Sequence, residues 1–173
     1  MRWQILVVLV TGPQLVHAQS TPRETAVERV EITQFGTYQT GKAGKVMPNP
    51  NAARGQVTFV GKHQLIERTD TICARLATTF GVEFKLVGTP TGRTVTLTMV
   101  TQFPPGGVTN DQAVNFRHNK FNSGQIIGDK DFRSFTFDEP YELVAGPWVL
   151  EFHYQGAVIG AQKFTVRNCD PAG

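Results

Sequence analysis

Two stretches in the middle of the chain alternate apolar and polar residues with the period of two that a half-buried β-strand requires. The first, residues 80–88, is FGVEFKLVG, and the second, residues 94–103, is TVTLTMVTQF. Between them, Pro90 and Gly92 are residue types that tight turns favour. The pattern therefore predicts a β-hairpin. The residues expected on its buried face are Phe80, Val82, Phe84, Leu86, Val95, Leu97 and Met99.

A second hairpin is predicted near the C-terminus, in residues 147–166. Its first arm, PWVLEFHY, alternates large apolar residues with Glu151 and His153. Gln155 and Gly156 interrupt the run, and the second arm, VIGAQKFTV, follows. Large aromatic residues at every second position are typical of a strand that faces the core. The expected core positions are Trp148, Leu150, Phe152 and Tyr154 on the first arm and Val158, Phe164 and Val166 on the second.

Further strands are predicted at residues 27–38, 63–72 and 132–137, whereas no segment has a convincing helical period. Residues 40–55, rich in Gly, Pro, Asn and Lys, are interpreted as a long exposed loop. Residues 104–131 are interpreted as a second long loop, of a length that is often either functional or mobile. Short strands separated by turn signals predict an all-β fold, an immunoglobulin-like β-sandwich of about seven to eight antiparallel strands.

An export signal is predicted at the N-terminus. Arg2 is followed by the apolar run ILVVLV, and the residues VHA precede Gln19 with the small side chains that a cleavage site favours. The apolar run is too short to span a bilayer as a helix. The alternative interpretation is a buried N-terminal strand. The expected organisation is a signal peptide over 1–18, a flexible N-terminus over 19–26, one sandwich domain over 27–168 and a C-terminal tail over 169–173.

Cys73 and Cys169 are the only cysteines of the chain. Because an exported protein meets an oxidising compartment, we expect them to form a structural disulfide. Closing a loop of this length stabilises a fold by roughly 4 kcal/mol in the chain-entropy model. The alternative is two separate buried thiols. Export also predicts a periplasmic or secreted protein with no membrane span once the signal is removed.

Composition and charge narrow the classes of partner. The hydrophobic content of 40% and the charged content of 18% are typical of a globular domain. The chain carries seventeen basic and fourteen acidic residues, and the basic ones are scattered along the sequence. A nucleic-acid interface needs basic residues gathered on one face, so no nucleic acid is expected as a partner.

Two segments resemble an uncharacterised family of bacterial exported domains. Residues 135–166 share that family's C-terminal pattern of Glu-Leu, Gly-x-Trp, Glu-aromatic and Phe-x-Val, and residues 71–105 are similar to its middle. The resemblance implies an immunoglobulin-like sandwich in the bacterial envelope. Because the family has no assigned activity, the resemblance implies no functional residue. The matching positions are Glu142-Leu143, Gly146, Trp148, Glu151-Phe152, Phe164 and Val166.

No catalytic residue and no cofactor are predicted. The serines after residue 18 are Ser20, Ser123 and Ser134, and none lies in a Gly-x-Ser-x-Gly elbow. The acidic segment DEPYE, residues 138–142, is interpreted as a turn in which Pro140 fixes the backbone and the carboxylates stay hydrated.

No metal site is predicted from the histidines, because His63, His118 and His153 lack the short spacing that places two ligands together. His153 does lie next to Glu151 on the outward face of its predicted strand. One alternative is therefore an enzyme or metalloprotein whose site is assembled from distant residues around His153, Glu151 and His63.

The predicted binding residues are Phe116, Arg117, His118, Lys120 and Phe121. They combine aromatic and adaptable polar side chains on a predicted loop, which suits recognition of a partner. The alternative is that Phe116 and Phe121 only hold the loop against the sandwich. We expect a non-enzymatic exported module that binds an unknown protein or glycan of the bacterial envelope.

Overall fold

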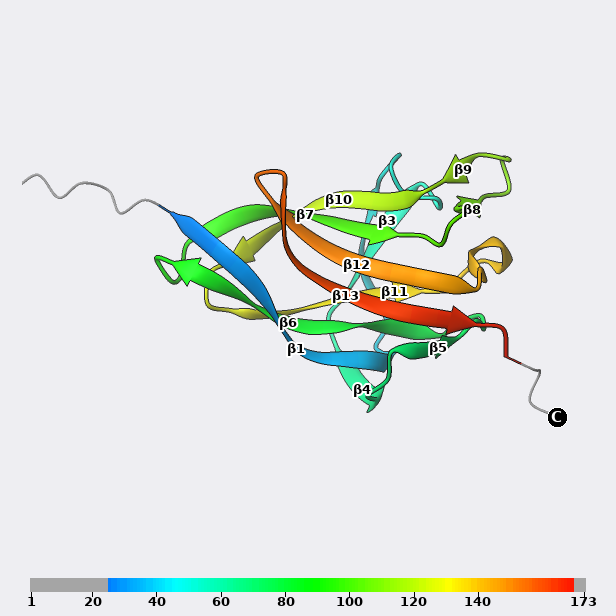
Figure 1. Cartoon of the computed structure of the whole chain (residues 1–173), viewed down its shortest axis with the longest axis horizontal. Coiled ribbons are helices and arrows are strands. Elements are labelled where there is room, and N and C mark those ends of the chain that lie inside the picture. The colour runs from blue at the N-terminus through cyan, green and yellow to red at the C-terminus, as the bar shows by residue number, and fades with distance from the viewer. Residues whose placement is uncertain (1–24, 170–173) are drawn as a thin grey trace, which may run out of the picture.

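The computed structural model describes residues 25–169 as two β-sheets packed face to face, with a separate hairpin crossing beside them (Figure 1). The all-β sandwich expected from the alternation pattern is confirmed. The predicted signal peptide, residues 1–18, lies outside the described residues, so it and the domain boundaries stay predictions. Within the described range, no helix is long and apolar enough to cross a membrane.

The first sheet has the strand order β11-β6-β1-β4, and all of its neighbouring strands are antiparallel. Gly81 allows the central strand β6 to approach β11 closely, because an added Cβ would lie 2.8 Å from the Cα of Ser134. The strands of this sheet are β1 (Ala26–Thr40), β4 (His63–Glu67), β6 (Thr79–Thr89) and β11 (Lys130–Thr136).

The second sheet has the order β10-β7-β12-β13-β5, and only β5 runs parallel to its neighbour. Here β12 and β13 form the predicted C-terminal hairpin. A register shift between Phe152 and His153 leaves Val158 more than half exposed, so its predicted core position is wrong. The strands are β5 (Thr71–Cys73), β7 (Thr94–Gln102), β10 (His118–Ile126), β12 (Gly146–Tyr154) and β13 (Ala157–Arg167).

Three smaller elements decorate the sandwich. The hairpin of β2 (Ala43–Pro48) and β3 (Gln56–Val60) is inserted between β1 and β4. The short pair β8 (Val108–Thr109) and β9 (Asn115–Phe116) precedes β10, and a single 3-10 turn, η1 (Pro140–Glu142), precedes β12. The pair β8–β9 and the turn η1 lie at the same end of the sandwich (Figure 1).

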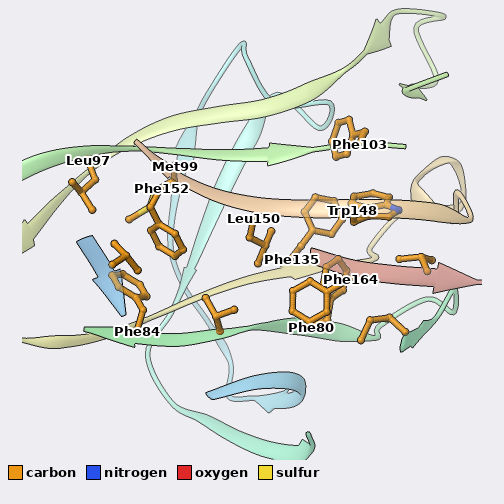
Figure 2. Close-up of a cluster of buried hydrophobic side chains, with 14 of the residues drawn as sticks. Phe80, Phe84, Leu97, Met99, Phe103, Phe135, Trp148, Leu150, Phe152 and Phe164 are labelled. Carbon is orange, nitrogen blue, oxygen red and sulfur yellow. The ribbon is translucent and has the colours of Figure 1, made fainter. Parts of the chain in front are cut away.

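Aromatic side chains fill the space between the sheets (Figure 2). Trp148 is fully buried, and its ring packs edge to face against Phe80 and Phe103 with centroids 6.0 and 4.9 Å away. Its indole N–H donates to the carbonyl oxygen of Val144 at 2.9 Å, so its one polar atom is satisfied. Each such side chain contributes roughly 1.5–3 kcal/mol by its burial.

One charged side chain also lies between the sheets. Arg133 on β11 is 5% exposed, and its guanidinium donates to the carbonyl oxygen of Glu151 at 2.6 Å and to Thr101 Oγ1 at 3.0 Å. The same group lies 5.2 Å from the ring centroid of Phe152. Burial lowers the pKa of Arg133 to about 9. Arg133 thus ties β11 of the first sheet to β7 and β12 of the second.

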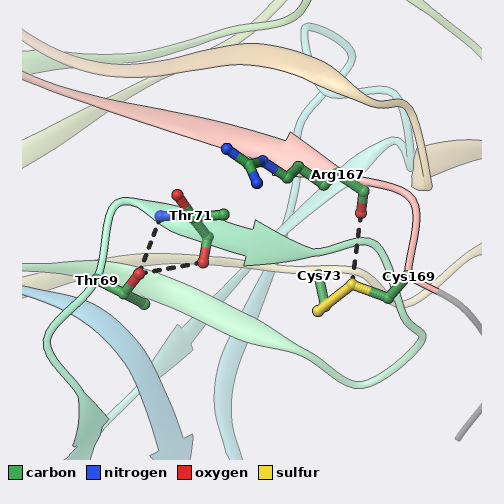
Figure 3. The surroundings of a disulfide bond; sticks show 5 residues. All are labelled: Thr69, Thr71, Cys73, Arg167 and Cys169. Carbon is green, nitrogen blue, oxygen red and sulfur yellow. Dashed lines mark hydrogen bonds between the residues drawn. A yellow bond between two sulfur atoms is a disulfide. The ribbon is translucent and has the colours of Figure 1, made fainter.

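The predicted disulfide is confirmed (Figure 3). It joins Cys73 at the end of β5 to Cys169, which follows β13, across a sequence separation of 96 residues. Because β5 is a three-residue edge strand, the covalent link fixes it to the strand with which it pairs.

The prediction that residues 80–88 and 94–103 form a hairpin is wrong. Both segments are strands with the expected buried faces, but β6 belongs to the first sheet and β7 to the second. The turn between them carries the chain across the core, so the two apolar faces meet as opposite walls of the sandwich. Alternation specifies which face of a strand is buried and does not specify its neighbour.

The two predicted long loops both contain strands. Residues 40–55 include β2, and residues 104–131 include the nine-residue strand β10. The sequence of β10, HNKFNSGQI, is rich in residues that strands normally disfavour. Pairing with β7 along its whole length overrides that preference.

Candidate functional site

The tip of the β2–β3 hairpin, residues 49–55, is docked against the edge of the second sheet. The side-chain amide of Asn49 donates to the carbonyl oxygen of Lys120 at 2.8 Å. The backbone N–H of Lys120 donates to the carbonyl oxygen of Asn51 at 3.2 Å. These two bonds place the hairpin tip directly beside β10.

Arg54 anchors the hairpin tip to the turn η1. Its guanidinium pairs with Asp138, and its Nε lies 3.2 Å from Glu142 Oε1. Glu142 is fully buried, and its Oε2 accepts the backbone N–H groups of Asp138 and Glu139 at 2.9 and 3.1 Å. Burial raises the pKa of Glu142 against the opposing effect of Arg54. The expectation that the carboxylates of this turn stay hydrated is therefore wrong for Glu142.

A groove of about 250 Å³ separates the hairpin from β10. Its apolar part includes Met47, which is 41% exposed, and the rings of Phe59 and Phe121, which pack edge to face with centroids 6.0 Å apart. Its polar part consists of asparagine amides and Lys120, the one charged residue of the lining. The lining residues are Met47, Pro48, Asn49, Asn51, Val57, Phe59, Lys120, Phe121 and Asn122.

A second cleft, of about 380 Å³, lies between the hairpin tip and the β8–β9 segment. Phe116 and Tyr141 supply its aromatic walls, and Asn110 donates from its amide to the carbonyl oxygen of Ala53 at 3.0 Å. Burial, reinforced by the charge of Glu142, raises the pKa of Tyr141. The hairpin tip thus forms a wall of both the groove and this cleft.

Three of the five predicted binding residues line these two hollows. Lys120 and Phe121 line the groove, and Phe116 lines the cleft. Arg117 and His118 are exposed and line neither. Phe116 and Phe121 also pack against the hydrophobic core, so they do hold this segment against the sandwich, as the alternative interpretation proposed.

The hairpin side of the groove is not predicted from the sequence. Met47, Asn49 and Phe59 fall in or next to a segment that was interpreted as an exposed loop. The available signal was the pair Val46-Met47, two apolar residues inside a stretch of Gly, Lys, Pro and Asn.

The residues of the metalloprotein alternative do not converge. On the second sheet, His153 Nε2 lies 2.9 Å from Glu151 Oε2, which also accepts the amide of Gln102 at 3.1 Å. His63 lies on β4 of the first sheet, 3.7 Å from Glu83. Within residues 25–169, no group of three His, Cys, Asp or Glu side chains could hold a metal ion.

The two face-to-face sheets define the class of an immunoglobulin-like β-sandwich. A solved immunoglobulin-like protein from Pseudomonas aeruginosa is similar over 82% of this chain and 99% of its own, with 26% identity and a TM-score of 0.52. The chain belongs to the family of the domain of unknown function DUF3859, whose model matches residues 26–166. The resemblance to an uncharacterised immunoglobulin-like family is therefore confirmed.

Two further comparisons add nothing to this assignment. The alkylpurine DNA glycosylase AlkC of Pseudomonas fluorescens matches 57% of this chain and 28% of its own, with 14% identity. Its TM-score of 0.39 is too low to support an argument. No curated protein matches the chain.

Proposed function

We propose that this chain is a non-enzymatic, exported binding module that recognises a protein or glycan of the bacterial envelope through the groove between the β2–β3 hairpin and β10. The observation that carries the proposal is the composition of this groove. Exposed Met47 and the rings of Phe59 and Phe121 lie next to three asparagine amides and one lysine. Recognition sites commonly combine an apolar surface with a few polar groups that fix orientation.

The hairpin supports the proposal because it is more than a connection. Strands β1 and β4 pair directly, and a short turn would suffice to join them. The chain instead extends residues 41–62 across to β10 and anchors the tip through Arg54 and Asn49. An anchored insertion that forms one wall of a groove is a suitable scaffold for a binding surface, since rigid walls reduce the entropy lost on binding.

Export is the second part of the proposal. The disulfide between Cys73 and Cys169 is consistent with an oxidising compartment, because cytosolic proteins seldom keep structural disulfides. We therefore place the protein in the periplasm or outside the cell. This location limits its ligands to components of the envelope and its surroundings.

Site-specific photocrosslinking in the native cell envelope tests the proposal. One variant carries a photoreactive amino acid at Met47, in the groove, and the matched control carries it at Val158, an exposed apolar residue on β13. In the order of the second sheet, β7 and β12 separate β13 from β10. Adducts are then analysed for both peptide and sugar.

We expect a defined protein or glycan adduct from position 47 that position 158 does not give. Identical adducts at both positions would mean that the groove has no special role. The absence of any adduct from position 47, in a chain that has reached the envelope folded, would contradict the proposal.

A further inference from the structure

The hydrogen bonds at the two ends of β10 show which of its residues face its partner strand. The carbonyl oxygen of Arg117 accepts the N–H of Phe103 at 3.0 Å, and the N–H of Ile127 donates to Arg93 at 2.9 Å. Between these points, residues His118–Ile126 pair one to one with β7 without a bulge. Since antiparallel strands alternate between residues that bond to the partner and residues that do not, the odd-numbered residues bond to β7.

The even-numbered residues therefore direct their backbone groups away from β7. Lys120 shows this, because both its N–H and its carbonyl oxygen bond to the hairpin tip. Beyond Lys120, the N–H and carbonyl groups of Asn122 and Gly124 have no partner within the described residues. The last such carbonyl, of Ile126, accepts the N–H of Asp129 at 3.1 Å. We call residues 122–126 the open edge of β10.

The open edge lacks the features that usually protect a sheet edge. Edge strands are normally blocked by a charged side chain, a proline, a bulge or a covering segment. Residues 122–126 read NSGQI, with no charge and no proline, and their register with β7 is regular. The hydrogen bonds from the hairpin tip to β10 reach no further along the strand than Lys120.

The groove meets the open edge at Asn122, which belongs to both. A strand added there would lie about 4.8 Å from β10 and would send alternate side chains to opposite faces. At the groove end, a side chain of the added strand that points into the groove would contact Met47, Val57 and Phe59. Lys120, the one charged residue of the groove lining, adds a positive charge at the same end.

We propose that the open edge binds an extended peptide segment of another protein, which adds as a strand beside β10. The segment places an apolar side chain in the groove and an acidic residue near the ammonium group of Lys120. The proposal rests on the groove being the binding surface, as argued under the proposed function. Main-chain hydrogen bonds to Asn122 and Gly124 would supply affinity, and the groove would supply specificity.

A library of random linear peptides displayed on phage, selected against the full mature chain, provides the probe. The critical variant is Gly124→Pro, which removes an N–H that β7 does not use, and edge strands tolerate proline at such positions. The matched control is Gly124→Ala, which keeps the N–H. A Cβ at this position would lie 3.8 Å from Thr94, its nearest neighbour, so alanine has room. The further ring atoms of proline would lie on the side of the N–H, which points away from β7.

We expect enriched peptides that combine an apolar with an acidic residue and that bind Gly124→Pro about tenfold more weakly, the effect of one or two lost hydrogen bonds. Gly124→Ala should bind them as the original chain does. A synthetic peptide with N-methyl groups at alternate positions repeats the test without altering the protein. N-methylation of the alternate residues whose N–H groups face β10 should abolish binding, and N-methylation of the residues between them should not.

Equal binding to Gly124→Pro together with no phase dependence would overturn strand addition. Failure to enrich any peptide would also overturn it, and self-association of the chain that Gly124→Pro abolishes would then identify a second copy as the occupant of the edge. Neither result contradicts the proposed function if the photoreactive residue at position 47 still gives its own adduct. Loss of that adduct as well would end both proposals.

Discussion

The substitution Arg54→Met tests how the hairpin is anchored. The variant keeps the length of the side chain and removes the charge that pairs with Asp138 and Glu142. Removing one partner of a fully buried ion pair costs about 3–5 kcal/mol. Two features reduce that figure, since the Arg54 side chain is 18% exposed and Glu142 keeps two backbone donors. We therefore expect a loss of roughly 2–3 kcal/mol in the free energy of unfolding.

Urea unfolding followed by the fluorescence of buried Trp148 measures this loss. The control is Arg29→Met, which removes a guanidinium whose two ion pairs are solvent-exposed and should change stability little. The double variant Arg54→Met with Glu142→Gln should lose less free energy of unfolding than the sum of the two single variants' losses, because the two side chains interact. A loss for Arg54→Met no larger than that of the control would refute the anchoring role.

The pH dependence of the free energy of unfolding gives a second check on the contact between Arg54 and Glu142. Burial raises the pKa of Glu142 in the folded chain, so its contribution to stability is greatest at low pH and declines as pH rises through the folded pKa. Arg54 opposes that rise, so Arg54→Met should raise the pKa of Glu142 further. The stability that Arg54→Met loses relative to the original chain should therefore be smaller near pH 4 than at pH 7. A deficit that is independent of pH would mean that Arg54 acts on another group.

Three further substitutions test other parts of the fold. Replacing Cys73 and Cys169 with alanine should cost roughly 2–4 kcal/mol, since their bond closes a long loop, and an unchanged urea midpoint would contradict this. Gly81→Ala should lower the free energy of unfolding by more than about 2 kcal/mol, because its Cβ would meet the backbone of β11. The control Gly61→Ala, whose Cβ would have no atom within 4 Å, should be nearly neutral, and equal effects of the two substitutions would disprove the close approach. Tyr38→Phe should gain up to about 1 kcal/mol, because the buried hydroxyl makes no hydrogen bond of good geometry among the described residues and has only a weak contact with the backbone of Glu83. Burial raises the pKa of Tyr38 from 10.0 to about 12, so the original chain should lose stability across that range, and a gap to the variant that stays constant would contradict the assignment.

The sequence predicts which face of a strand is buried better than it predicts which strands pair with each other. The alternation in β6, β7 and β12 correctly predicted their buried sides, and the two cysteines, taken with the predicted export signal, correctly predicted the disulfide. The pairing of β6 with β7 could not be excluded from the sequence, because a hairpin and a crossing between sheets share the same alternation. The exposure of Val158 depends on a register shift, which leaves no sign in the alternation.

The candidate site was predicted in part, for a similar reason. Phe116, Lys120 and Phe121 do line hollows of the surface, and the mixture of aromatic and polar residues directed attention to them. The other wall comes from the β2–β3 hairpin, more than fifty residues earlier in the chain, and only the fold brings the two together. The burial of Glu142 was missed because its partner Arg54 is also distant in sequence.

Backbone amide exchange along β10, measured residue by residue by NMR, tests the central claim that the open edge and its groove are the binding surface. In the isolated chain, the amides of Phe121 and Ser123 should be protected by β7, whereas those of Asn122 and Gly124 should exchange fast. Adding the ligand captured through position 47 should slow Asn122 and Gly124 selectively. Protection of these two amides without ligand, or slowing confined to other strands, would contradict the account.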